Sequence, residues 1–152
     1  MNHLKSTQIA AMNMHYQRVG FTTFLDSLVN LGISQFELWA GAPHYFNPEF
    51  DPSAARKLKA EVEARQLAIV CLTPEQCVYP YNIAASDNNL RRESLDYFAS
   101  YIRQAAVLGI NKILLTSGWG LYDENPRDAW DRCFEALFYL LKLCEKEGVT
   151  IA

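Results

Sequence analysis

The segment Leu108-Gly109-Ile110-Asn111-Lys112-Ile113-Leu114-Leu115-Thr116 joins the end of an amphipathic pattern to a run of apolar residues. Glycine readily adopts the left-handed backbone conformation that closes a helix, and an apolar run after it is typical of a buried strand. The same junction occurs at Leu31-Gly32-Ile33 before residues 35–39, and again at Glu147-Gly148-Val149 near the end of the sequence. These junctions predict that helices and strands alternate along the chain.

A fourth junction, Arg65-Gln66-Leu67 before residues 68–72, has no glycine, and we predict the first strand at residues 8–13. Between the strands, apolar residues recur at i, i+3, i+4 and i+7, the spacing of an amphipathic helix. Asp51-Pro52 and Asn125-Pro126 each place a capping side chain before a proline that suits the first helical position. The helical positions are Phe21, Phe24, Leu25 and Leu28, then Phe98, Tyr101, Ile102 and Ala105, and finally Trp130, Cys133, Phe134 and Leu137. This alternation predicts βαβ units and a parallel sheet.

The rhythm of the strands favours a (β/α)8 (TIM) barrel. The strand starts recur about every 30 to 45 residues, so that eight units need roughly 250 to 300 residues. The 152 residues hold four units and the start of a fifth strand, and we therefore expect one domain, the N-terminal half of a barrel truncated to about its first four βα units. A doubly wound fold is the alternative. It usually has a glycine-rich first turn, whereas residues 13–18 contain no glycine and Gly118-Trp119-Gly120 lacks a third.

Composition narrows the class of protein further. Half of the residues are hydrophobic and the formal net charge is −3, which indicates a folded domain with little attraction for nucleic acid or an anionic membrane. No apolar run approaches the roughly 20 residues that span a bilayer. We therefore expect a cytoplasmic protein with neither a nucleic acid nor a membrane as partner.

The four cysteines have neither metal-site nor redox-motif spacing. Cys133 and Cys144 are predicted on one helix, about 16 Å apart at about 1.5 Å per residue, too far for a disulfide. We expect all four, Cys71 and Cys77 included, to be reduced and mostly buried.

Strand alternation selects one acidic residue as a candidate for function. Phe36 and Leu38 fall on one face of their strand and Glu37 and Trp39 on the other. The apolar pair suits the helix layer, so we expect the Glu37 carboxylate to enter the lumen near the carboxyl ends of the strands, where barrel active sites lie. The alternative is a structural salt bridge from Glu37 to a lysine or arginine on a neighbouring strand.

Three loops at the same end add further candidates. His44, in the loop after the second strand, is a candidate hydrogen-bond partner of a substrate hydroxyl, or a surface histidine satisfied by water. The loop at residues 73–82 is long and aromatic, and its tyrosines either wall a ligand or pack over the end of the barrel. Trp119 lies between two glycines, where its ring can lie flat against a ligand.

Four motifs, taken in order, resemble the sugar isomerase and epimerase group that has the xylose-isomerase-like barrel. The motifs are Glu37-Leu38-Trp39-x-Gly41-x-Pro43-His44, Thr73-Pro74-Glu75, Tyr79-Pro80-Tyr81-Asn82 and Arg91-Arg92-Glu93-Ser94-Leu95-Asp96. The resemblance implies epimerisation of a keto sugar or a sugar amine of the fructoselysine type. A divalent metal such as Mn²⁺ would stabilise the enediolate while two glutamates move the proton.

The resemblance also implies a division of the site. The metal ligands and both glutamates of that group come from the fifth to eighth strands, the first of them a few residues beyond Ala152. We therefore expect residues 1–152 to bind no metal, to hold no catalytic residue and to be inactive alone, while they bind the small-molecule sugar. The substrate-binding residues that the resemblance implies are Glu37, Trp39, His44, Glu75, Tyr81, Ser117 and Trp119.

Two other readings stay open. The first is a non-catalytic half-barrel that forms a homo-oligomer or pairs with a partner, with its first and fourth strands as open edges. The second is a barrel endonuclease that acts at damaged DNA, which the net charge of −3 disfavours.

Overall fold

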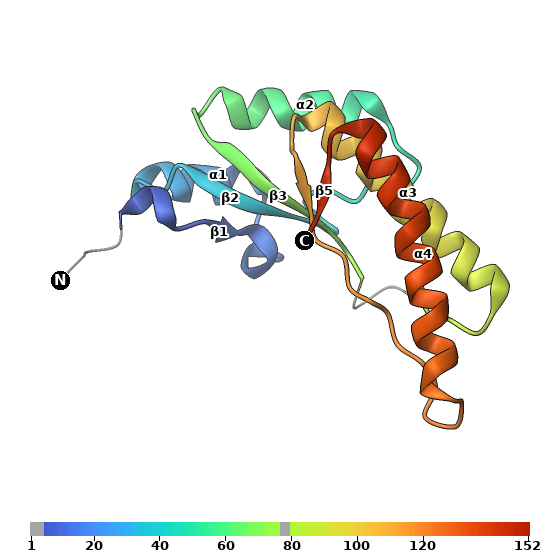
Figure 1. The fold of residues 1–152 in the computed structure, drawn as a ribbon. Helices are drawn as coiled ribbons and strands as arrows, with labels where there is room; N and C mark the ends of the chain where they lie inside the picture. Colours follow the sequence, from blue (N-terminus) through green and yellow to red (C-terminus); the bar gives the residue numbers. More distant parts are fainter. Residues whose placement is uncertain (1–4, 77–79) are drawn as a thin grey trace.

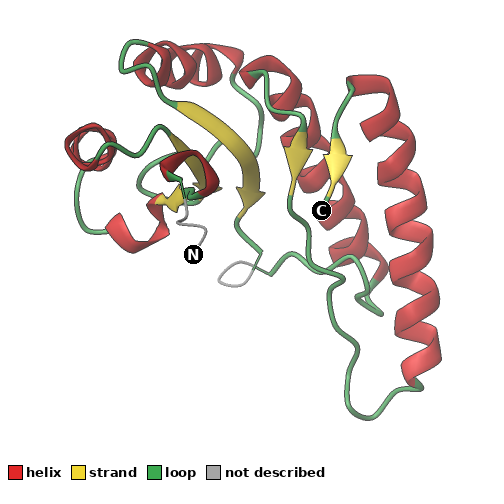
Figure 2. Cartoon of the chain, turned by 60° about the vertical axis from the view of Figure 1, so that its left-hand side comes forward, coloured by secondary structure: helices red, strands yellow, loops and turns green. Residues whose placement is uncertain are grey.

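The computed structural model describes residues 5–76 and 80–152, which form one parallel sheet with helices alongside it (Figures 1 and 2). The sheet order is β1-β2-β3-β4-β5, and every pair of neighbours is parallel. The strands are β1 (Ala11–Met12), β2 (Gln35–Ala40), β3 (Ala68–Pro74), β4 (Lys112–Ile113) and β5 (Thr150–Ile151). The helices are α1 (Phe21–Leu31), α2 (Pro52–Glu63), α3 (Asn88–Leu108) and α4 (Pro126–Glu147), with short 3-10 turns η1 (Ser6–Gln8) and η2 (Asn13–Tyr16). The predicted βαβ order is confirmed.

The helix junctions have the backbone geometry that the sequence predicts. Gly32, Gly109 and Gly148 all end their helices in the left-handed region, with φ between 68° and 77°. At the glycine-free junction Gln66 adopts the same conformation, with φ 56°, although a side chain there costs about 1–2 kcal/mol. The junction geometry is therefore kept even where no glycine supports it.

The core lies between the sheet and the helices. Phe36 and Leu38 of β2 are fully buried, as alternation predicts. The Phe36 ring meets Phe24 of α1 edge to face, with centroids 5.3 Å apart. Helices α2, α3 and α4 follow one another along the sheet, each in contact with the next (Figure 1). The opposite face of β2, with Glu37, is left for the site.

Two strands are shorter in the structure than the sequence predicts. The first strand covers only Ala11–Met12, because 3-10 turns occupy Ser6–Gln8 and Asn13–Tyr16 on either side of it. The fourth covers only Lys112–Ile113, although the Leu114 amide still donates to Leu72 O at 2.9 Å.

The predicted edge at the fourth strand is also wrong. Strand β5 pairs with β4, with Lys112 opposite Thr150 and Ile113 opposite Ile151. Backbone hydrogen bonds from Thr150 to Asn111 and from Ala152 to Ile113 complete the ladder at 2.9 and 2.8 Å. In the sheet of the described residues, the outer strands are β1 and β5.

A side-chain amide continues the ladder where β1 stops. The fully buried Asn13 donates from Nδ2 to the Trp39 carbonyl at 3.0 Å, and its Oδ1 accepts the Trp39 backbone N–H at 2.7 Å. One carboxamide thus replaces the peptide group of a neighbouring strand. Trp39 is thereby held in extended geometry beyond the last β1 pair, Met12 opposite Glu37.

A second amide does the same between β3 and β4. Gln76 donates from Nε2 to the Leu114 carbonyl at 3.0 Å, and its Oε1 accepts the Thr116 amide at 2.6 Å. The Gln76 side chain is almost fully buried. It therefore fixes the path of the chain after β4, where regular pairing has ended.

None of the helices in residues 5–76 and 80–152 has the length and apolar character needed to cross a bilayer.

Replacement of Asn13 by alanine tests the amide ladder. Asn13→Ala leaves two buried backbone groups of Trp39 without partners, so the free energy of unfolding should fall by about 2–4 kcal/mol. Urea unfolding measures the change, and Asn30→Ala, at an exposed position of α1, should change it by no more than about 0.5 kcal/mol. Equal effects of the two substitutions would contradict the role of Asn13.

Candidate functional site

A cavity of about 210 Å³ lies at the carboxyl ends of the central strands. Parallel strands bring these ends to one edge of the sheet, which is where barrel enzymes place their sites. The cavity is lined by Met12, Met14, Glu37, Trp39, Thr73, Pro74, Glu75, Gln76, Leu114 and Thr116. Three of the predicted site residues, Glu37, Trp39 and Glu75, therefore come together from two neighbouring strands and the loop that follows them.

Glu75 and Trp39 form a buried pair in this cavity. The Trp39 indole Nε1–H donates to Glu75 Oε2 at 2.6 Å, and the two residues are only 6% and 2% exposed. The Glu75 backbone carbonyl accepts the Tyr97 hydroxyl of α3 at 2.9 Å. Because the carboxylate fixes one edge of the indole, the ring of Trp39 has a single orientation at the cavity.

Gly41 allows this packing. A Cβ atom at Gly41 would lie 2.1 Å from the Trp39 ring, far inside van der Waals contact. The loop after β2 can therefore turn over the indole only with glycine at this position.

Glu37 lies on the same face and pairs with a hydroxyl. Thr73 Oγ1–H donates to Glu37 Oε1 at 2.5 Å. Within the described residues, Glu37 forms no salt bridge. The alternative of a structural ion pair is therefore wrong there. Burial and the nearby Glu37 charge both raise the pKa of Cys71, which lies opposite Glu37 in the β2–β3 register. The second carboxylate oxygen, Oε2, has no hydrogen bond within the described part of the chain and remains an acceptor for a ligand.

His44 is held by protein groups at both ring nitrogens. Asn13 Nδ2 lies 3.0 Å from Nδ1, and the Val19 carbonyl lies 2.9 Å from Nε2. A carbonyl only accepts, so Nε2 carries the hydrogen and Nδ1 accepts from Asn13. The ring is absent from the lining of the 210 Å³ cavity. His44 thus braces Asn13, and its contact with a sugar stays a prediction.

The other predicted residues lie apart from this cavity. Tyr81 stacks on Tyr97 with ring centroids 3.5 Å apart, which matches the alternative that it packs over the end of the barrel. Ser117 is exposed and its hydroxyl donates to the Gly118 carbonyl at 3.3 Å. Cys77 and Tyr79, which belong to the same predicted loop as Tyr81, lie outside the described residues.

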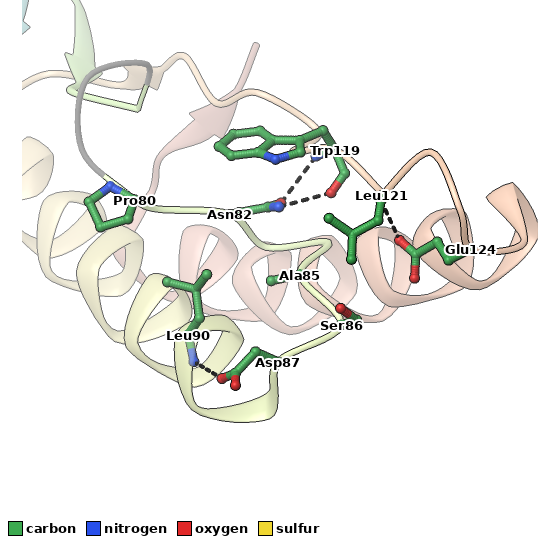
Figure 3. Close-up of a pocket in the computed structure, with 9 residues that line it drawn as sticks. All are labelled: Pro80, Asn82, Ala85, Ser86, Asp87, Leu90, Trp119, Leu121 and Glu124. Carbon is green, nitrogen blue, oxygen red and sulfur yellow. Dashed lines mark hydrogen bonds between the residues drawn. The ribbon is translucent and has the colours of Figure 1, made fainter.

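Trp119 lines a second cavity, of about 240 Å³, between the β3–α3 and β4–α4 loops (Figure 3). Asn82 accepts the Trp119 backbone N–H at 3.1 Å and donates to its carbonyl at 2.8 Å, a third use of a side-chain amide as a peptide partner. Gly118, with φ 73°, makes this approach possible, since a Cβ there would lie 2.2 Å from Asn82 Oδ1. Contact of the Trp119 ring with a ligand stays a prediction.

The amides and the hydroxyl that build the site are not among the site residues predicted from the sequence. Asn13, Gln76 and Thr73 each follow or end an apolar strand. A polar side chain that can both donate and accept, placed at the end of a predicted strand or a few residues after it, is the signal that marks Asn13 and Gln76. Thr73 has no such signal, because its role depends on the register between β2 and β3.

The described residues do not supply a metal site. No group of three or more His, Cys, Asp or Glu side chains gathers in residues 5–76 and 80–152. Glu37 accepts the Thr73 hydroxyl and Glu75 accepts the Trp39 indole. The donor set therefore does not fit a divalent cation, and the absence of metal binding by this segment stays a prediction.

A parallel sheet with a cavity at the carboxyl ends of its strands occurs in barrel proteins and in doubly wound proteins alike, and the comparison with known families decides between them. The family model described as the xylose isomerase-like TIM barrel matches residues 25–152. The chain belongs to the xylose isomerase-like TIM barrel family.

Individual relatives agree with this family. The chain is 30% identical to fructoselysine 3-epimerase of Shigella flexneri over 136 residues. The aligned residues are 90% of this chain and 49% of that protein. The corresponding protein of Escherichia coli O157:H7 is 29% identical over 136 residues, with 90% and 50% covered. The chain thus spans about half the length of these curated relatives. The predicted resemblance is confirmed at this level.

Solved structures confirm the half-barrel fold. A putative xylose isomerase from Rhodospirillum rubrum superposes with a TM-score of 0.80 at 11% identity, over 94% of this chain and 52% of that one. D-psicose 3-epimerase from Clostridium cellulolyticum H10 gives 0.74 at 14% identity, over 93% and 50%. At such low sequence identity, the structural similarity is evidence for the fold alone.

Replacement of Glu75 by alanine tests the buried pair. Glu75→Ala removes the acceptor of the Trp39 indole N–H, so the free energy of unfolding should fall by about 1.5–3 kcal/mol. The indole ¹H–¹⁵N spectrum, with one signal for each of the 3 tryptophans, should show the Trp39 signal displaced. Glu63→Ala, at an exposed position of α2, is the matched control and should leave both readouts unchanged. An undisturbed Trp39 signal in Glu75→Ala would contradict the pairing.

Proposed function

We propose that this chain forms the sugar-binding half of an isomerase or epimerase that acts on a keto sugar or a sugar amine through a metal-stabilised enediolate. The observation that carries the proposal is the cluster of Glu37, Trp39 and Glu75 around one cavity at the carboxyl ends of β2 and β3. The relatives named fructoselysine 3-epimerase support the same substrate class.

The chemistry of the cavity suits a sugar. A sugar presents hydroxyl groups at its edges and C–H groups on its faces, so it needs polar groups and an apolar wall together. Glu37 Oε2 is an open acceptor, Thr116 adds a hydroxyl, and Met14 and Leu114 contribute apolar surface to the same cavity. At about 210 Å³ the cavity is smaller than the roughly 300–1,000 Å³ of ordinary ligand sites, so it suits part of a ligand.

The proposed role of these residues is to bind and to orient. Trp39 is fixed by Glu75 and by Asn13, so it presents its ring without a loss of side-chain freedom when a ligand arrives. Glu37 accepts a hydroxyl proton in a hydrogen bond and sets which edge of the sugar faces the strand ends. The metal and the carboxylates that move the proton are proposed to come from the portion of the relatives that this chain does not cover.

A titration tests sugar binding. Fructoselysine or D-fructose added to the ¹⁵N-tryptophan-labelled chain should displace the Trp39 indole signal. Glu37→Gln, which weakens a charge-assisted hydrogen bond, should reduce the affinity about tenfold. Glu49→Gln, at an exposed position, serves as the control. Equal affinities for Glu37→Gln and the wild type would overturn the role of Glu37.

The same preparation tests catalysis. Residues 1–152 with added Mn²⁺ in D₂O should exchange no proton of a keto sugar above the buffer rate, because no catalytic pair is assigned to them. Exchange is measured by the loss of the ¹H signal at the carbon beside the carbonyl. Turnover by this chain would show that it holds the catalytic groups.

A self-associating half-barrel is the second candidate, and the outer face of α4 favours it. Besides Tyr139, four large apolar side chains of α4 are exposed: Trp130 at 65%, Phe134 at 63%, Phe138 at 54% and Leu141 at 45%. They recur at helical spacing and form a stripe, within which the rings of Phe134 and Phe138 stack. A contiguous apolar patch of this kind marks an interaction surface.

Substitution within the stripe tests this second candidate. If the chain self-associates through α4, light scattering after size exclusion should show an oligomer that Phe134→Ser with Phe138→Ser converts to a monomer. Glu135→Ser, at an exposed polar position of the same helix, should leave the oligomer intact. A monomeric wild-type chain at high concentration would remove this candidate.

A further inference from the structure

We propose that the 240 Å³ cavity beside Trp119 holds an aliphatic tail that ends in an ammonium group, the part of the substrate that extends beyond its sugar ring. The inference rests on the proposed function, since it assigns a second subsite to the same ligand.

The cavity has the shape and lining of a site for an aliphatic chain. Figure 3 shows the indole of Trp119 on one side and Leu90 on the other, with Pro80 and Leu121 at the two ends. Trp119 is 52% exposed, so its ring is available to a ligand. Most of the surface that these side chains offer is hydrocarbon, which suits the methylene groups of a tail.

The indole is presented on a fixed backbone. Both backbone groups of Trp119 are hydrogen-bonded to the Asn82 side chain, at 2.8 and 3.1 Å. Asn82 is itself held, because its Oδ1 also accepts the Ala84 amide at 3.0 Å. A wall fixed in this way loses little entropy when a ligand binds.

The charges around the cavity favour a cation. Its lining residues include two carboxylates, Asp87 and Glu124, and no lysine, arginine or histidine, while the Arg91 guanidinium beside it is engaged by the Ala85 carbonyl and by Asn88. Asp87 Oδ1 accepts the amides of Asn89 and Leu90, whereas Oδ2 has no hydrogen bond within the described residues. Glu124 is paired with Arg132, which lowers its pKa and keeps it ionised. Asp87 Oδ2 and the face of the Trp119 ring are thus the two groups that attract an ammonium.

The β3–α3 and β4–α4 loops contribute lining residues to both cavities. Gln76 and Thr116 line the cavity at the strand ends, and Asn82 and Trp119 line the second one. Thr116 and Trp119 are three residues apart, so their Cα atoms lie at most about 11 Å from each other. A ligand with a sugar ring and an alkylamine tail of several carbons therefore spans both cavities.

Binding of simple tail analogues tests the assignment without sugar and without turnover. The ¹⁵N-tryptophan-labelled chain is titrated with pentylammonium, 1-pentanol and pentanoate, and Trp119→Phe identifies the Trp119 indole signal. That signal should shift, with pentylammonium bound most tightly and pentanoate most weakly, while the signal of Trp130 stays in place. No shift of the Trp119 signal, or pentanoate bound as tightly as pentylammonium, would overturn the proposal.

A matched pair of variants isolates the charge. Asp87→Asn keeps the helix cap, because asparagine caps as well as aspartate, and should weaken pentylammonium binding about two- to fivefold without change for 1-pentanol. Glu93→Gln removes an exposed charge from the same helix and should have no effect. Equal effects of the two variants would contradict the role of Asp87.

Sugar-linked probes separate this proposal from the general one. The tail of fructoselysine ends in an ammonium and a carboxylate on one carbon, so the matched probe is fructose linked through nitrogen to 1,5-diaminopentane, whose tail ends in an ammonium alone. This probe should bind more tightly than D-fructose, and Asp87→Asn should reduce that advantage while D-fructose binding stays the same. If D-fructose displaces the Trp39 signal but the amine-tailed probe gains nothing, the tail subsite is wrong and the sugar site stands. If pentylammonium displaces the Trp119 signal but neither sugar displaces the Trp39 signal, the proposed sugar site is wrong. The cavity beside Trp119 then still binds an ammonium group, but its assignment to the tail of a sugar substrate is contradicted.

Discussion

The arrangement of the site depends on three carboxamides that take the place of peptide groups. Asn13, Gln76 and Asn82 each donate to one backbone carbonyl and accept one backbone N–H across a gap between strands or loops. All three are buried, where an unpaired polar group costs about 1–3 kcal/mol. Because both halves of each amide are used, the segments beyond β1, β3 and β4 are fixed although the strands themselves have ended. This is why two-residue strands suffice to position a site.

The two carboxylates at the cavity of the strand ends are likewise hydrogen-bonded within the protein. Glu37 and Glu75 lie on a surface that the sheet partly shields from water, and each has a neutral donor, the Thr73 hydroxyl or the Trp39 indole. A neutral donor stabilises a carboxylate without cancelling its charge, unlike the lysine or arginine of an ion pair. The Oε2 atom of Glu37 therefore stays without a hydrogen bond among the described residues. The bracing of Asn13 by His44 extends this network to the loop after β2.

The sequence determined the fold more fully than the site. Helix ends at Gly32, Gly109 and Gly148, and the caps at Asp51 and Asn125, are local features, and local physics predicts them. The burial of Phe36 and the opposite orientation of Glu37 follow from strand alternation alone. The lengths of β1 and β4 and the partners of His44 could not be predicted, because they depend on contacts between residues far apart in the chain. Asn13, for example, meets Trp39 26 positions later, and no local pattern encodes that distance.

Under the proposed function, the two cavities would divide ligand recognition between the strands and the loops of the fold. The one at the strand ends is built on β2 and β3, whose backbones pair over several residues, and its orientation is set by buried hydrogen bonds. The one beside Trp119 is built from loops and the first turn of α3, and loops tolerate change more readily than strands. Changes at Leu90, Leu121 or Asp87 would alter the size and charge of the second cavity without disturbing Glu37 or Trp39. A barrel can thus keep one way of holding a sugar ring while its loops select what is attached to that ring.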